Sequence, residues 1–104
     1  MYSNAELEAT HGGIPEWTQV DELITMLEKT DIPFTVTPSH GRPQVWYPDD
    51  KHSICDAICN WGSYGHQTGL IEIMGLTHND DSVEGYLTAD EVFARIKEHW
   101  EANK

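Results

Sequence analysis

The feature that most constrains the fold is a change of hydrophobic period near residue 34. From there to residue 75, apolar and polar side chains alternate in short runs, which predicts β-strands rather than helices. Four such runs are present: FTVTP, QVWYP, SICDAICNW and GLIEIMGL. The turn SHGRP joins the first two, so we expect them to pair as a hairpin. The last two are expected to pair across the glycine-rich segment between them.

A helix is predicted on each side of this β region. The first begins after Thr18, an N-cap residue, and ends before Pro33, because the residue before a proline avoids helical geometry. Its apolar positions follow helical spacing: Val20, Leu23, Ile24 and Leu27. Thr88 and Glu91 form a capping box for the second helix. Its apolar face consists of Ala89, Val92, Phe93, Ile96 and Trp100.

These elements predict an α+β fold in the order αββββα. We expect an antiparallel four-stranded meander with the N-terminal and C-terminal helices packed on one face, because such a sheet commonly buries only one side. A chain of 104 residues, 38% of them apolar, has enough material for one domain. Residues 1–16 contain Gly-Gly and Pro15 and are predicted to form an irregular arm, and residues 17–104 to form the domain.

Several classes of protein are disfavoured by what the sequence lacks. No stretch approaches the roughly 20 consecutive apolar residues that a membrane span requires, and the N-terminus has neither a basic nor an apolar leader segment. We therefore expect a cytoplasmic protein that makes no membrane contact. Because the sequence has no nucleophile elbow, phosphate loop or dinucleotide fingerprint, we expect no enzyme activity and no cofactor.

The two cysteines, Cys55 and Cys59, are expected to be reduced and partly buried. On a strand they would lie about 13 Å apart, which is too far for a disulfide. Together with His52 and His66 they have the ligand types that suit zinc. Their spacing is not that of a zinc finger, and the strand geometry separates the thiols, so no metal site is predicted.

The charge of the chain points to a class of partner. Eighteen acidic side chains against six basic ones give a formal net charge of −12. Direct binding to nucleic acid or to an anionic membrane is therefore disfavoured, and a basic protein is the natural electrostatic counterpart. The acidic residues that we expect to contact this partner are Asp49, Asp50, Asp80, Asp81 and Glu84.

The segment CNWGSYGHQTGL, residues 59–70, is the candidate binding loop. It is longer than the two to five residues usual in hairpin loops, so chain reversal alone does not demand it. Trp61 and Tyr64 are of the residue types that most often dominate binding energy, and His66 lies beside them in sequence. Two interpretations stay open: either the rings project as binding anchors, or they fold down and cover one end of the sheet.

A second motif, DDSVEGYLTADE at residues 80–91, has part of the register of a calcium-binding EF-hand loop. Asp80, Ser82 and Glu84 occupy alternate positions, followed by Gly85 and, at the last position, Glu91. The preceding LIEIMGL is too short and too β-like to be the entering helix. Calcium binding is therefore a minor alternative.

The segments GLIEIMGL and VEGYLTADEVFARI, with QVWYP and SYG upstream, carry a resemblance over residues 17–97. In these the chain resembles small uncharacterised proteins encoded by phages and prophages of Gram-positive bacteria. The resemblance brings no known activity. It implies a setting in the host cytoplasm, where small phage proteins often inhibit or modulate host machinery, including defence enzymes.

Two functions are consistent with these observations. The first is a protein-binding inhibitor whose acidic surface imitates a nucleic-acid backbone and occupies a basic channel of a host protein such as a nuclease. The second is a small-ligand binder that stacks a nucleotide base on the residues of the 60–69 loop. The shortage of lysine and arginine argues against the second, because a phosphate would meet a repulsive field. The sequence predicts neither the identity of the target nor the oligomeric state.

Overall fold

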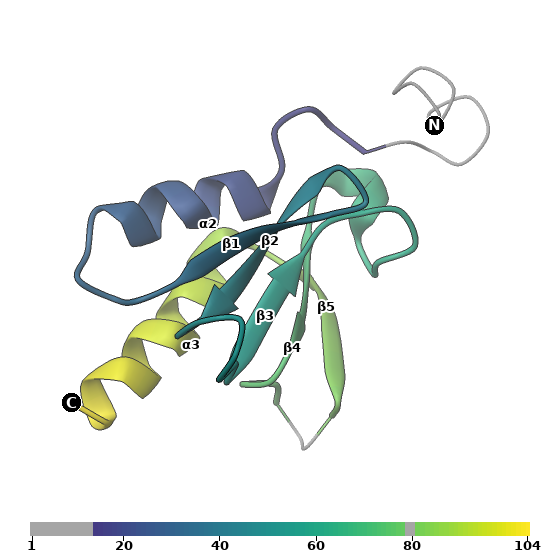
Figure 1. Cartoon of the computed structure of the whole chain (residues 1–104). Coiled ribbons are helices and arrows are strands. Elements are labelled where there is room, and N and C mark those ends of the chain that lie inside the picture. Colours follow the sequence, from purple (N-terminus) through teal and green to yellow (C-terminus); the bar gives the residue numbers. More distant parts are fainter. Residues whose placement is uncertain (1–13, 79–80) are drawn as a thin grey trace.

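The computed structural model describes residues 14–78 and 81–104 (Figure 1). Its elements follow one another as α2 (Gln19–Glu28), β1 (Thr35–Ser39), β2 (Arg42–Tyr47), β3 (Cys55–Ile58), the 3-10 helix η1 (His66–Thr68), β4 (Ile71–Met74), β5 (Val83–Leu87) and α3 (Ala89–Ala102). The strands form one sheet in the order β1-β2-β3-β4-β5, and every neighbouring pair is antiparallel. Neither described helix is long and apolar enough to cross a membrane.

The α+β class, the two helices and the meander are confirmed, but the number of strands is wrong. All four predicted strands are present with the predicted neighbours, and a fifth, β5, follows them in the order αβββββα. The sequence VEGYL does not by itself predict a strand, because Glu84 and Gly85 are both of low β-propensity. The strand forms because it pairs with β4 and because α3 holds it from the core side.

The helix caps formed as predicted. The Thr18 side chain accepts from the N–H of Val20, and the Asp21 carboxylate accepts from the N–H of Thr18 at 2.8 Å. At α3, Thr88 and Glu91 make the reciprocal bonds of a capping box, 3.1 and 3.3 Å long. Each cap satisfies N–H groups that the first turn of a helix leaves without a partner.

Both helices lie on the same side of the sheet, as Figure 1 shows, and the core fills the space between. The strand register brings one residue of each strand into a row that faces the helices: Val36, Val45, Ala57, Ile73 and Glu84. The three central members are buried, together with Leu23 and Leu27 of α2 and Val92 and Ile96 of α3. We call this row the core-side row.

The neighbouring row points to the other side of the sheet, because successive side chains of a strand alternate between faces. This row contains Thr35, Trp46, Asp56, Met74 and Val83. Neither α2 nor α3 covers it (Figure 1). We refer to this side of the sheet as the open face.

The start of the described chain is tied to the sheet. Ile14 is buried in the core, and the guanidinium of Arg42 donates to the carbonyl oxygens of Ile14 and Pro15 at 3.1 and 2.8 Å. Residues 1–13 of the predicted arm lie outside the described residues. The boundary at residue 16 therefore stays a prediction.

Both cysteines are free, and they are buried more completely than predicted. Cys55 lies on the core side of β3, and Cys59 lies just beyond the end of this strand. Burial raises the pKa of Cys55 to about 12 and that of Cys59 to about 11. Both therefore stay protonated thiols at neutral pH, a state in which cysteine is neither a good nucleophile nor a metal ligand.

Candidate partner-binding surface

The structure divides the predicted contact residues between opposite ends of the sheet. The β2–β3 and β4–β5 connections lie at one end, with Asp49, Asp50 and Asp81 in them and Glu84 just inside β5. The β3–β4 connection, with Trp61, Tyr64 and His66, lies at the other end. Because these strands are four to six residues long, the two ends are roughly 13–20 Å apart. Asp80 lies outside the described residues.

The β3–β4 connection is held by a buried polar framework and is not a loose link. The N–H of Asn60 donates to the Ser63 hydroxyl, which donates in turn to the Asn60 carbonyl at 2.9 Å. The Asn60 amide reaches across to the Ser39 hydroxyl at 2.9 Å, and both Asn60 and Ser63 are buried. The carbonyl of Gly69 accepts from the N–H of Gln19 at the start of α2. The connection is therefore anchored to β1 and to α2.

The aromatic rings of this connection project from that framework. Trp61 is 45% exposed and Tyr64 is 59% exposed, and Tyr86 of β5 joins them with 66% of its surface exposed. The rings of Tyr64 and Tyr86 are stacked, with centroids 6.4 Å apart and planes inclined by 23°. We call these two residues the tyrosine pair. Tyr86 is not among the predicted contact residues, because the sequence VEGYL does not predict a strand that would place it beside Tyr64.

The tyrosine pair is built on close backbone contact. The N–H of Tyr86 donates to the carbonyl of Tyr64, and a Cβ atom at Gly85 would collide with Cβ of Tyr64. Tyr86 has a φ of +59°, a left-handed conformation that is a genuine outlier for a bulky aromatic residue. The N–H of Tyr64 donates to the Glu72 carboxylate at 3.1 Å. The surrounding contacts therefore maintain a strained backbone that keeps both rings on the surface.

His66 does not project from the surface with Trp61. It is partly buried and packs against the Trp61 ring. Its ring meets the Trp61 ring edge to face, with centroids 5.1 Å apart. Its Nδ1 lies 2.7 Å from the Ser63 carbonyl oxygen, which can only accept, so Nδ1 is the donor in this hydrogen bond. Its Nε2 is buried with no hydrogen-bond partner among the described residues.

At the opposite end of the sheet, Asp49 is engaged in its own turn. Its Oδ1 accepts from the N–H groups of Lys51 and His52 at 2.9 and 2.8 Å. These bonds, that of His52 first, hold the pKa of Asp49 below its usual range. Asp50 and Asp81 are exposed.

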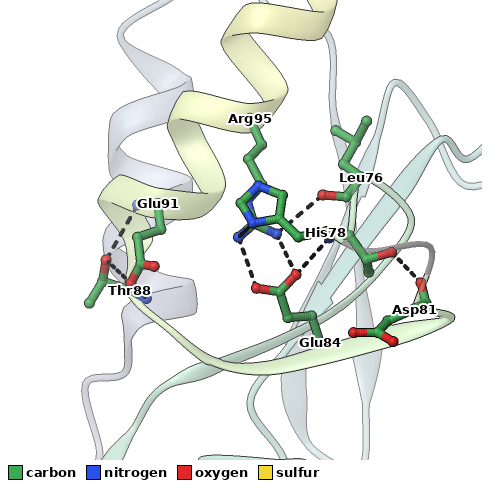
Figure 2. A network of polar contacts seen from close by, with 8 residues as sticks. Leu76, His78, Asp81, Glu84, Thr88, Glu91 and Arg95 are labelled. Carbon is green, nitrogen blue, oxygen red and sulfur yellow. Dashed lines mark hydrogen bonds and ion pairs between the residues drawn. The ribbon is translucent and has the colours of Figure 1, made fainter.

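Glu84 is already bonded to other residues of the protein. Figure 2 shows its carboxylate between Arg95 of α3 and the backbone of His78. Arg95 donates two hydrogen bonds of 2.9 Å to it and a third, of 3.2 Å, to the carbonyl of Leu76. The hydrogen bond from Arg95 lowers the pKa of Glu84 to about 2. This carboxylate is therefore not free for a partner in the structure described.

Two carboxylates of the EF-hand-like motif, Glu84 and Glu91, are bonded to other groups of the protein. Glu84 is paired with Arg95, and Glu91 accepts from the N–H of Thr88, also visible in Figure 2. Across residues 14–78 and 81–104, no group of three or more His, Cys, Asp or Glu side chains is placed to hold a metal ion.

The basic side chains that could neutralise this surface are few, and both arginines are occupied. Arg42 binds two backbone carbonyls, and Arg95 binds Glu84. A pocket of about 380 Å³ lies between α3 and residues 76–78. Arg95 is part of its lining, but its charge is already paired there. The pocket therefore has little to offer an anionic ligand.

In comparisons with protein-family models, with curated proteins and with solved structures, nothing matches this chain.

Proposed function

We propose that this chain is an acidic binding protein that attaches to a basic host protein, such as a nuclease, and inhibits it by occupying the surface that nucleic acid would take. The observation that carries the proposal is the outward placement of Trp61 and the tyrosine pair on a rigid framework in a strongly acidic chain. Rigid aromatic side chains give a large contact area and lose little conformational entropy on binding.

The charge of the chain supports a basic partner. With a formal net charge of −12, and with both arginines bound internally, the chain presents a negative field to its surroundings. Such a field accelerates encounter with a cationic surface and repels nucleic acid. Spaced carboxylates can pair with the lysine and arginine side chains that would otherwise contact a phosphate backbone.

The alternative is a nucleotide-type ligand with its base stacked on the tyrosine pair. Stacking on one ring is chemically available, since Tyr64 and Tyr86 are both well exposed. The phosphate is the difficulty, because the two arginines are already paired. We therefore rank this function second.

The test is capture from a bacterial lysate with the purified chain immobilised. The parent is compared with the double variant Trp61→Ala/Tyr64→Ala and with the control Ile54→Ala, which removes an exposed apolar side chain from the opposite end of the sheet. We expect a basic protein to be retained by the parent and the control and lost from the double variant. Equal retention by all three would overturn the proposal. A retained ultraviolet-absorbing small molecule would favour the nucleotide alternative.

The salt dependence of binding to the captured protein tests the electrostatic part. If carboxylates steer association, the on-rate falls steeply from low to physiological ionic strength, while the off-rate changes less. Surface plasmon resonance at several salt concentrations measures both rates. An on-rate that is insensitive to salt would indicate a mainly apolar interface.

A further inference from the structure

The open face of the sheet has an acidic residue at its centre. Asp56 lies on β3, the middle strand, with Trp46 of β2 directly opposite on one side and Met74 of β4 directly opposite on the other. Residues paired in this way have Cβ atoms about 4.5–5.5 Å apart and share one face. The Trp46 indole is fixed by a 2.7 Å hydrogen bond to the Thr37 hydroxyl, and Met74 is 53% exposed. Asp56 therefore lies between an indole and an exposed thioether side chain.

Asp56 has polar neighbours of its own but no cation. The Gln44 side chain and the N–H of Met74 donate to its carboxylate, and none of the described basic residues pairs with it. Burial raises the pKa of Asp56, and the nearby charge of Glu72 raises it further. Both effects disfavour the ionised carboxylate. A cation placed here would stabilise the ionised form and would supply the charged partner that Asp56 lacks in the free protein.

The open face is continuous with the tyrosine pair. Glu72 precedes Met74 by two residues on β4, so both side chains are on the open face, about 7 Å apart along the strand. The Glu72 carboxylate accepts the N–H of Tyr64. One extended segment of a partner could therefore contact the tyrosine pair and Asp56 together.

We infer that Asp56 binds an arginine side chain of the basic partner. The guanidinium is hydrogen-bonded to the Asp56 carboxylate and lies against Trp46 and Met74, and we call this position the arginine seat. The inference rests on the proposed function and names the chemistry of the partner at one position. Arginine fits better than lysine, because its planar guanidinium can bond a carboxylate with two parallel N–H groups and can also stack on an indole.

The test uses two synthetic peptides in calorimetric titrations at low ionic strength. One alternates arginine and glycine, and the other has lysine in place of every arginine. The variant Asp56→Asn keeps the shape of the side chain, and the control Glu28→Gln removes the same charge from an exposed position of α2, on the other side of the sheet. We expect Asp56→Asn to weaken the arginine peptide about tenfold and the control to weaken it less than about twofold.

A second variant guards against an effect of folding. Met74→Lys changes an exposed side chain, and the added ammonium pairs with Asp56, so we expect it to weaken the arginine peptide at least as much. Thermal unfolding of each variant checks that the fold is intact. The lysine peptide should bind the parent more weakly and respond less to Asp56→Asn.

The outcomes separate the inference from the function on which it rests. Equal losses in Asp56→Asn and Glu28→Gln, or equal binding of the two peptides, would show that only the total charge matters and would overturn the arginine seat. The proposed function would survive that result if Trp61→Ala/Tyr64→Ala still abolished capture of the basic protein. Failure of the parent to bind either peptide would overturn the arginine seat as well, and capture by the double variant would then decide the function separately.

Discussion

The carboxylate of Glu84 on β5 receives two hydrogen bonds from the guanidinium of Arg95 on α3, each 2.9 Å long. This pair occupies the β5 end of the core-side row, where the other strands place aliphatic side chains. Arg95 also donates to the carbonyl of Leu76, so the same guanidinium holds the β4–β5 connection. The last strand is therefore attached to the helix layer by charge as well as by packing.

Replacing Glu84 by Gln should lower stability at neutral pH by about 1–2 kcal/mol, a modest value because solvent reaches the pair. The pKa of Glu84 falls from 4.5 in the unfolded chain to about 2 in the folded one. The contribution is therefore present above pH 4.5 and is lost as the pH falls from there toward 2. Urea unfolding at pH 7 and at pH 3 measures it.

Glu101→Gln is the matched control for this experiment, since it removes one exposed carboxylate near the end of α3. It should change stability by less than about 0.5 kcal/mol at either pH. If Glu84→Gln were no more destabilising than this control at pH 7, the ion pair would not contribute to the attachment of β5.

The elements that could be predicted from the sequence are those with local signals. The caps at Thr18 and Thr88, the helical stripes and the first hairpin are encoded by residues close together in the chain. Strand β5 is not, because Glu84 and Gly85 become compatible with a strand only through Arg95 and Tyr64, which are distant in sequence.

The candidate site divides in the same way. Residue type alone pointed to Trp61 and Tyr64, whose exposure the structure shows. Tyr86 and Asp56 complete the candidate surface, and their placement depends on how the strands pair. Periodicity within one strand does not determine that register. The order of the strands also decides that Asp49, Asp50 and Asp81 lie at the opposite end of the sheet from Trp61 and Tyr64.

Two glycines with positive φ should respond very differently to alanine. At Gly75 a Cβ atom would collide with the carbonyl oxygen of Ile54, where the β2–β3 and β4–β5 connections meet. Gly62 has open space around the same position, so only the left-handed backbone is unfavourable there. We expect a loss of about 1 kcal/mol for Gly62→Ala and of more than about 3 kcal/mol for Gly75→Ala. Chemical denaturation of both variants measures these losses. A loss for Gly75→Ala no larger than that for Gly62→Ala would contradict the prediction.

The cysteines should be unreactive in the folded protein. With pKa values of about 12 for Cys55 and about 11 for Cys59, almost no thiolate forms at pH 8, and both side chains are buried. A colorimetric thiol reagent should therefore react only at the rate at which the chain opens, and promptly with both residues in denaturant. Fast labelling of one thiol under native conditions would show that the packing around that cysteine is open to solvent.

The stability of loop variants distinguishes the two roles open to Trp61 and Tyr64. Because these rings are 45% and 59% exposed, their joint replacement by alanine should cost less than about 4 kcal/mol of folding free energy, well below the cost of removing two fully buried rings. Partner affinity should fall by at least about 2 kcal/mol, as at a binding hot spot. Ser63→Ala, which removes a buried hydroxyl with two bonds inside the loop, should instead destabilise the fold by about 1–3 kcal/mol. A double variant that unfolds several kcal/mol more easily yet still binds its partner when folded would make the rings a cover for the sheet, with the contact surface elsewhere.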